Sequence, residues 1–569
     1  MSSHRTKDLA QSRLFQQYSH DWPLRDRIRL SYQRAQAIGR AYGFTRDDVI
    51  NTTEKLWQLH TDPICGIDGA AAILATIQYN LCAGTIAPYA TQHIEVSKTL
   101  ERVLSFEVSG QFLLTELGHG IDALHLETTA TLLPDGSFEL NTPHERAGKY
   151  MPPTVPMGYP TIAVVMARTL VDGADHGVKP FLAPINDGET MHPGVVCRYL
   201  SQRGGNTPLT HSITYFDHVR IPAYSLLGKI TGPVNHRQSF FEAISRVPYG
   251  TIALSSLAVP ALQIMSTICA RYSMRRTVFS NEEIQKPILS FRTQQVPILT
   301  ALAQAYVMRA LFDASIKLFT DASLDFRVRH AIATATKSVM VCHTQKAALE
   351  LGERCGAQGL FEINQISSIF NDFRGIAIAE GDLLVLSVRM ATELLLNRYC
   401  VPKSPNPESH LARHELGLFT ELRSVLKAHQ HRSEEFNRQV LPQCRLFVQS
   451  IGERMAYDAA VASGLDSCLV DMYVVSCIKH DPAWYSEELN LSRARVQAME
   501  DAAIESMYPR LEEFIARTEV EPYISAPLLS SRRWEAYESQ MTVYGDSPRF
   551  KTGPSDFNNI LSFSRQARL

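Results

Sequence analysis

Apolar residues in the N-terminal part of the chain recur at three- and four-residue spacing, as they do on the buried face of a helix. Two segments show this pattern: "RDRIRLSYQRAQAIGRAYG" (25–43) and "GIDGAAAILATIQYNLCAGT" (66–85). From about residue 106 the pattern changes to short strand-like runs separated by turn residues, such as "TATLLPDGSFEL" with its Pro-Asp-Gly turn. We therefore predict an N-terminal helical domain over residues 1–105 and a middle β-domain over residues 106–232.

Long helical patterns return after residue 232. The runs "AQAYVMRALFDASIKLF" and "RHAIATATKSVMVCHTQKAALELGERCG" are typical of antiparallel bundle helices. Residues 401–415, "VPKSPNPESHLARHE", are rich in proline and are predicted to be a linker between a helical bundle, 233–400, and a second helical domain, 416–569. His410 and His414 lie in this linker without a third ligand nearby, so we expect solvated histidines and no metal site.

The composition excludes several classes of function. Lys plus Arg (56) nearly balance Asp plus Glu (58), so no overall charge favours nucleic acid as a partner. The ten cysteines form no CxxC pair, which is typical of a reducing compartment rather than of a disulfide framework or a zinc site. The longest uncharged run, residues 251–270, contains polar residues and Pro260, and this favours a buried helix over a membrane span.

Two acidic residues, Glu380 and Asp382, lie in an otherwise apolar segment, "RGIAIAEGDLLVLSV" (374–388). A buried carboxylate must find a partner, hold a proton, or act as a base with a raised pKa. In the first interpretation Asp382 caps a helix whose buried face begins with Leu383, Leu384 and Leu386. In the second, Glu380 is a general base. The local pattern alone leaves both interpretations open.

Four segments bear on this choice. In chain order they are "LLTELGHGIDALHLETTATLLPDGSFELNTP" (113–143), "RYSMRRTVFS" (271–280), "ERCGAQGLFEINQISSIFNDFRGIAIAEGDLLVL" (353–386) and residues 451–493. Together they resemble the acyl-CoA dehydrogenase and acyl-CoA oxidase superfamily, and especially its peroxisomal oxidases. The resemblance implies an α+β, acyl-CoA dehydrogenase-like fold. Such a fold has an N-terminal helical domain, a β-barrel-like middle domain, a C-terminal helical bundle and the additional helical domain of oxidases.

The resemblance also implies roles for individual residues. The first segment is similar to the motif Thr-Glu-x-Gly-His-Gly, so Thr115 is expected to face the flavin of FAD and Gly120 to lie close to it. The second resembles a stretch that meets the FAD of a neighbouring subunit, which implies that role for Arg276 and Phe279 and a homodimer as the assembly. An arginine fork suits a diphosphate.

The third segment is similar to the family's Gly-Gly-x-Gly-Tyr loop followed by its Phe-Glu-Gly-Asp element. Gly356 and Asp382 are thereby implied to bind the cofactor, and Glu380 is implied to be the catalytic base. The apolar surroundings of Glu380 are then explained, because an acyl chain and a flavin are expected around it. Desolvation would raise the pKa of this carboxyl towards the range of a general base.

The implied activity is FAD-dependent α,β-dehydrogenation of an acyl-CoA or related acyl thioester, with O2 as acceptor and H2O2 as product. A dehydrogenase with a protein acceptor, a specialised biosynthetic flavoenzyme and a flavin-free scaffold remain alternatives. The segment "KYMPPTVPMGYP" (149–160) departs from the family's Trp-Pro-Gly-Gly-Leu-Gly, and Gly158 is taken as its flavin-contacting glycine. Because of this departure, the acyl chain length and exact substrate stay open.

The C-terminus of the chain resembles a peroxisomal targeting signal. Its last residues, Ala567, Arg568 and Leu569, are a conservative variant of the Ser-Lys-Leu peroxisomal signal. The N-terminus lacks the apolar core of a secretory signal. We therefore expect a peroxisomal protein.

Overall fold

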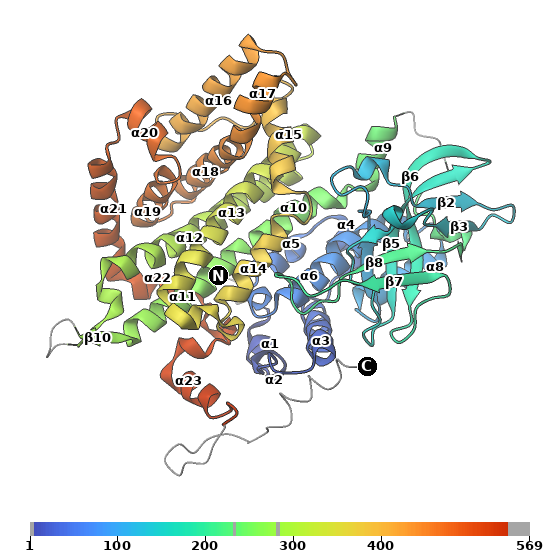
Figure 1. Ribbon diagram of the computed structural model, residues 1–569, viewed down its shortest axis with the longest axis horizontal. Helices are drawn as coiled ribbons and strands as arrows, with labels where there is room; N and C mark the ends of the chain where they lie inside the picture. The colour runs from blue at the N-terminus through green and yellow to red at the C-terminus, as the bar shows by residue number, and fades with distance from the viewer. Residues whose placement is uncertain (1–4, 231–234, 280–284, 544–569) are drawn as a thin grey trace.

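The computed structural model describes residues 5–230, 235–279 and 285–543. Figure 1 shows the labelled strands from β2 (Thr129–Leu132) to β8 (Ser212–Phe216) gathered on the right of the molecule and most of the long helices on the left, with the hairpin of β10 (Thr277–Phe279) at the far left. The predicted Ala567-Arg568-Leu569 signal and the boundary at residues 232 and 233 lie outside the described residues. The N-terminal helices are α1 (Lys7–Gln11), α2 (Arg13–Gln16), α3 (Leu24–Tyr42), α4 (Arg46–Ile50), α5 (Glu54–Thr61), α6 (Gly69–Thr76), the π-helix η2 (Ile77–Ala83), α7 (Gly84–Ile86) and α8 (Ile94–Leu104).

The strand-rich part contains two sheets. One has β5 at its centre, pairing parallel with β1 and β2 and antiparallel with β6; β3 and β9 complete it. The other has the order β4-β8-β7. Gly136 has φ +84° in the predicted Pro-Asp-Gly turn, which joins β2 and β3 as an antiparallel hairpin. The strands are β1 (Ser109–Leu113), β2 (Thr129–Leu132), β3 (Phe138–Asn141), β4 (Lys149–Tyr150), β5 (Thr161–Val171), β6 (Ala174–Asn186), β7 (Val195–Tyr199), β8 (Ser212–Phe216) and β9 (Val219–Ile221).

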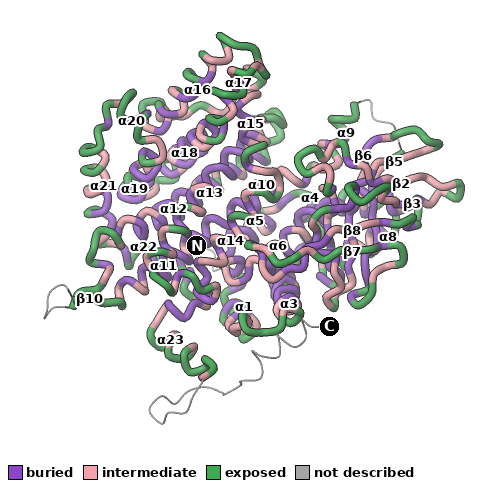
Figure 2. Tube along the Cα trace, in the orientation of Figure 1, coloured by how far each residue is buried: buried purple, intermediate pink, exposed green. Residues whose placement is uncertain are grey.

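Long helices form the core of the rest of the molecule, and Figure 2 shows their buried inner faces. Residues Gly69–Tyr89 and Arg246–Arg275 are long and apolar enough to cross a membrane, but 89% and 94% of their apolar windows are buried inside the protein. They therefore pack here as core segments. The helices of this part are α9 (His236–Ala243), α10 (Arg246–Ser256), α11 (Ala258–Arg275), α12 (Arg292–Thr320), α13 (Phe326–Arg354), α14 (Ile366–Ile376) and α15 (Leu383–Leu395); the hairpin β10 (Thr277–Phe279) and β11 (Gln285–Pro287) follows α11.

The C-terminal helices pack on α12, α13 and α15 mainly through α18. Glu453 of α18 accepts hydrogen bonds from His343 of α13, at 3.1 Å, and from His480, at 2.7 Å. This buried polar group ties the two helices together. The C-terminal helices are α16 (His410–Ala428), α17 (Glu434–Gln439), α18 (Cys444–Ala462), α19 (Ser467–Ile478), α20 (Pro482–Leu489), α21 (Arg493–Met507), α22 (Leu511–Thr518) and α23 (Ser531–Glu538).

The predicted linker is shorter than expected. Helix α16 begins at His410, because the Ser409 hydroxyl caps it by accepting from the Ala412 amide at 3.2 Å. The expectation of solvated histidines was wrong for His414, which is 1% exposed and bonds Asp481 at 3.1 Å. The proline-rich run obscured the start of an amphipathic helix whose buried face includes His414.

Candidate active site

Glu380 lies in the turn between α14 and α15, with its carboxyl group against α10. A Cβ atom at Gly250 would lie 2.6 Å from the Glu380 Cδ, so only glycine at that helix position leaves room for the carboxyl. The backbone is left-handed at Glu380 (φ +54°) and at Gly381 (φ +98°). Because a left-handed glutamate is strained, the surrounding contacts must hold it in place.

Burial of Glu380 raises the pKa of its carboxyl group above neutrality. This pKa reaches about 8, against the opposing fields of Lys337 and Arg246. Arg246 donates to the Asn80 carbonyl at 3.0 Å and to its Oδ1 at 2.9 Å, and burial lowers the pKa of this arginine to about 10. A carboxyl with a pKa near neutrality can accept and release a proton at physiological pH, as a general base requires.

Asp382 occupies the helix cap. Its carboxylate accepts from the amides of Leu384, at 3.0 Å, and Val385, at 3.1 Å, so the predicted cap is confirmed. Leu383 is 3% exposed as expected, but Leu384 is 54% exposed, which corrects the predicted buried face. The cap and the candidate base are therefore two different residues, and the two interpretations of the segment do not compete.

Side chains that the sequence analysis missed hold the Glu380 turn. Lys337, in the middle of α13, donates to the carbonyl oxygens of Ala379, at 2.5 Å, and Gly381, at 2.6 Å. Thr251 of α10 donates to the Glu380 carbonyl at 2.8 Å. These contacts join residues distant in sequence, so no local pattern could have revealed them.

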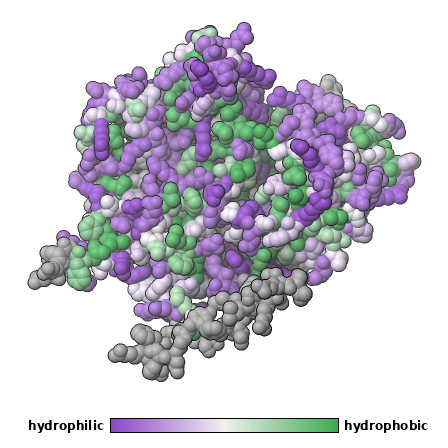
Figure 3. All heavy atoms as spheres, viewed as in Figure 1, coloured by the Kyte–Doolittle hydropathy of each residue, from purple (hydrophilic) through white to green (hydrophobic). Residues whose placement is uncertain are grey.

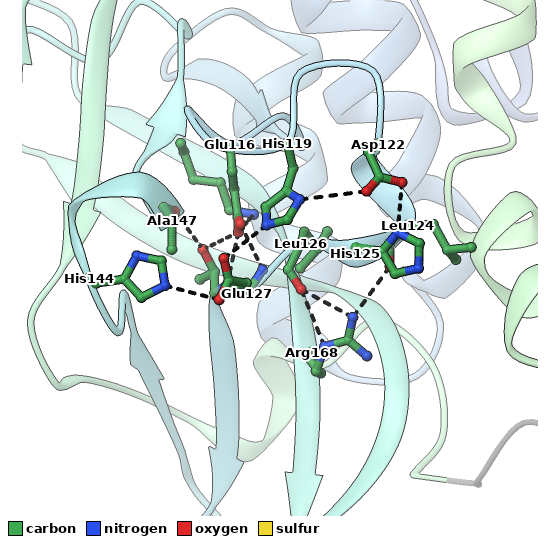
Figure 4. Close-up of polar contacts among 12 residues, drawn as sticks. Glu116, His119, Asp122, Leu124, His125, Leu126, Glu127, His144, Ala147 and Arg168 are labelled. Carbon is green, nitrogen blue, oxygen red and sulfur yellow. Dashed lines mark hydrogen bonds and ion pairs between the residues drawn. The ribbon is translucent and has the colours of Figure 1, made fainter.

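On the β-domain side, Thr115 follows β1 and its carbonyl accepts from the Tyr150 amide at 2.8 Å. The next residue, Glu116, is 1% exposed, and its carboxylate accepts from the Glu127 amide and from both the amide and the hydroxyl of Thr128. Figure 4 shows Glu116 at the centre of this loop. The loop between β1 and β2 is thus folded around one buried carboxylate.

Lys149, which is fully buried, completes the partners of Glu116. Its ammonium lies 3.0 Å from the Glu116 carboxylate and also donates to the Met166 carbonyl at 2.7 Å. Burial lowers the pKa of Lys149 to about 8 although Glu116 opposes the shift. Burial would raise the pKa of Glu116, but Lys149 and the amide and hydroxyl donors outweigh it and hold that pKa below its usual range. The pair fixes β4 against the Thr115 turn.

A more exposed ring of contacts surrounds this pair (Figure 4). Glu127 bonds His119 and His144, each at 2.9 Å. Gly120 and Ile121 follow His119 at the tip of the loop. Among the described residues other than its two chain neighbours, none has an atom within 4 Å of a Cβ built on Gly120, and Ile121 is 78% exposed. The tip therefore leaves open space where the resemblance expects a ligand.

The structure places the other expected cofactor residues in different regions. Gly158 (φ +87°) donates its amide to the Gly188 carbonyl at 2.8 Å, in the loop between β4 and β5. Arg276 ends α11, and Phe279 is 65% exposed on the following hairpin. Gly356 (φ +59°) follows α13. In Figure 1 the hairpin at β10, which carries Phe279 and directly follows Arg276, lies at the opposite side of the molecule from the strand-rich part. One chain therefore does not bring Arg276 and Phe279 next to Gly158.

Comparison with known proteins supports the resemblance to acyl-CoA oxidases. Residues 249–395 match the model of the acyl-CoA oxidase C-alpha1 domain. Human peroxisomal acyl-coenzyme A oxidase 3 is 30% identical over 328 residues, covering 52% of this chain and 46% of that protein. The chain spans about half the length of the curated relatives it matches.

Solved structures extend the likeness over the whole fold. Acyl-CoA oxidase 1 from Yarrowia lipolytica has a TM-score of 0.76 at 19% identity, covering 91% of this chain and 86% of that one. Acyl-CoA oxidase-2 from Caenorhabditis elegans, solved with FAD, ascaroside-CoA and ATP, has a TM-score of 0.69 at 16% identity, covering 100% of this chain and 99% of that one. The predicted acyl-CoA dehydrogenase-like fold is confirmed, and so is the predicted resemblance to acyl-CoA oxidases.

Proposed function

We propose that this chain is an FAD-dependent acyl-CoA oxidase. It converts an acyl-CoA or related acyl thioester and O2 into the enoyl thioester and H2O2. The observation that carries the proposal is the Glu380 carboxyl, whose pKa is raised to about 8 by burial and which lies against the glycine at position 250. The names of the relatives support the same reaction.

Glu380 removes the α-proton of the acyl thioester in this mechanism. Among the described residues, none accepts a hydrogen bond from the Glu380 amide, which is therefore available to the thioester oxygen as enolate charge develops. FAD, when bound, would supply the acceptor for the β-hydride and the redox chemistry with O2. Lys337 and Arg246 favour the ionised, proton-accepting form of Glu380.

The residues expected to hold FAD fit the cofactor. The Thr115 hydroxyl makes no hydrogen bond to any described residue, so it is available to a ligand. The Arg276 side chain likewise has no ion pair within the described part of the chain, and its planar fork suits a diphosphate. Gly120, Gly158, Gly356 and Asp382 remain proposed cofactor contacts. The C. elegans neighbour solved with FAD supports this cofactor.

A homodimer would bring Arg276 and Phe279 of one copy close to the strand-rich part of the other, which carries Thr115 and Gly158. Large hydrophobic side chains are exposed on the hairpin, at the start of α12 and in the turn after α13: Val278, Phe279, Phe291, Leu360 and Phe361. Figure 3 shows hydrophobic atoms next to the hairpin. Such a surface is typical of a protein interface. We propose that a second copy covers it, so that Arg276 and Phe279 reach the partner's FAD.

Arg276→Ala is expected to weaken FAD retention, because it removes a charge-assisted contact to phosphate. The measurement is the ratio of flavin to protein absorbance after extensive dialysis, together with light scattering. Arg309→Ala, which removes an exposed arginine paired with Asp313 on α12, is the matched control and should retain FAD. A clean monomer with stoichiometric FAD would contradict the role given to Arg276.

We propose import into peroxisomes through Ala567, Arg568 and Leu569, in keeping with the peroxisomal relatives. A fluorescent protein carrying the last dozen residues should become punctate and coincide with a peroxisomal marker. Removal of the final three residues should leave the fusion diffuse. Punctate fluorescence without those three residues would show that the targeting signal lies in another part of the fusion.

Anaerobic and aerobic assays together test the reaction. The purified protein should be yellow, an acyl-CoA should bleach its flavin without oxygen, and oxygen should restore the colour with one H2O2 per enoyl thioester. Branched and specialised thioesters belong in the substrate panel. Reduction without reoxidation by O2 would favour a dehydrogenase with a protein acceptor, and colourless protein that binds no FAD would favour a scaffold.

A further inference from the structure

The Glu380 turn is held by side-chain donors at three consecutive carbonyl groups. Lys337 binds the carbonyls of Ala379 and Gly381, which flank Glu380 on either side, and Thr251 binds the carbonyl of Glu380 itself. The donors come from α13 and α10, which pack against each other. The turn is therefore fastened to two core helices, in addition to its local backbone hydrogen bonds from Ala379 to Gly375 and from Leu383 to Ala377.

The backbone at this turn needs such support. Glu380 and Gly381 have φ values of +54° and +98°, and a left-handed conformation is unfavourable for glutamate. The turn also directs the carboxyl group towards Gly250. A relaxed backbone would move the carboxyl away from its place against α10.

Lys337 is an unusual residue for a merely structural anchor. It is 0% exposed, and no carboxylate in the described residues lies within salt-bridge distance of its ammonium, so carbonyl oxygens are the acceptors of its hydrogen bonds there. Its charge nevertheless acts on Glu380 through space and favours the ionised carboxylate. A neutral donor could cap the same carbonyls without burying a charge.

We propose that Lys337, with Thr251 as its partner, is a positioning residue that fixes the Glu380 turn in its left-handed conformation and supplies a positive field to the Glu380 carboxylate. The proposal rests on the assignment of Glu380 as the base. It adds a requirement for a buried cation on α13 that never touches the substrate. Thr251 contributes geometry, and Lys337 contributes both geometry and charge.

Lys337→Met tests both contributions, because methionine is unbranched and about as long but has neither donor nor charge. We expect flavin reduction by saturating acyl-CoA to slow about tenfold to a hundredfold, as for a misplaced catalytic group, with substrate affinity nearly unchanged. The rate should still rise with pH, but its midpoint should move upward by about one pH unit, because Lys337 is gone and only Arg246 of the two cations that favour ionised Glu380 remains. Lys346→Met, at an exposed position of the same helix, should change neither quantity.

Hydrogen exchange provides a readout that needs no turnover. In Lys337→Met the amides of residues 377–386 should exchange faster than in the wild type, while those of α12 should not change. Wild-type exchange in this turn together with a wild-type pH profile would overturn the proposal, even if the melting temperature fell. If acyl-CoA never reduces the wild-type flavin, the proposed oxidase function fails, yet the exchange experiment still decides whether Lys337 orders the turn.

Thr251→Val gives a second test should Lys337→Met fail to fold. Valine keeps the shape of threonine and removes the hydroxyl bound to the Glu380 carbonyl. We expect faster exchange in the turn and a slower reduction, with an unchanged pH midpoint because no charge is lost. Wild-type exchange and rate in Thr251→Val would overturn the anchoring. A shifted midpoint in this uncharged variant would overturn the assignment of the field to Lys337.

Discussion

Glu380→Gln is expected to slow flavin reduction by acyl-CoA about a hundredfold or more. The amide keeps the size of the side chain and much of its hydrogen bonding but cannot accept the α-proton. The variant should fold, remain yellow and bind acyl-CoA. Stopped-flow absorbance under anaerobic conditions measures the rate, and Glu487→Gln, at an exposed position of α20, is the matched control.

The pH dependence provides a second readout for the same residue. Because burial raises the pKa of Glu380 to about 8, the wild-type rate should increase with pH and reach half its maximum near pH 8. A raised pKa in the folded state means that the proton stabilises the folded protein. That contribution is complete below the unfolded pKa, about 4.3, and is lost as pH rises through about 8.

Glu380→Gln should therefore gain stability relative to the wild type at pH 9, since it has no buried carboxylate to ionise. Asp382→Ala should instead lose about 1 kcal/mol, because Asp382 is the cap of α15. Melting curves at two pH values separate these outcomes. Reduction of Glu380→Gln at the wild-type rate with any active substrate would remove Glu380 from the mechanism.

Part of this site could be predicted because its signals are local. The cap at Asp382 follows from an acidic residue before an apolar run, and Glu380 was found through an element that resembles a known family. Nothing in the local sequence predicts the positive φ at Glu380, because Gly381 alone is sufficient to explain a turn at this place. The role of Gly158 stays a prediction, because the structure shows only its turn and its bond to Gly188.

Other parts depend on tertiary contacts that no pattern in one sequence reveals. Lys337 stands in an apolar helix where a lysine would ordinarily reach solvent, and only the packing of α13 against the Glu380 turn shows its partners. The prolines before His414 predict a longer linker, whereas the Ser409 cap starts the helix earlier and buries His414. Tertiary packing decided these assignments, as it often overrides local pattern.

Lys149→Met is expected to lower the free energy of unfolding by about 3–5 kcal/mol, the usual cost of leaving a buried charge without its partner. Glu116 is 1% exposed and would lose the only cation that pairs with it among the described residues, and the carbonyls of Leu114 and Met166 would lose a donor. Denaturant unfolding measures the loss. Lys98→Met, which breaks an exposed pair with Glu95, is the control and should change stability little.

Adding Glu116→Gln to Lys149→Met should restore part of the lost stability, because the neutral amide still accepts from Glu127 and Thr128 but leaves no buried charge. FAD content should fall in the single variant as well, since the pair holds Thr115 next to Tyr150, where the flavin is proposed to bind. A single variant as stable as Lys98→Met, or a double variant no more stable than the single one, would show that the Glu116–Lys149 pair does not organise this side of the site.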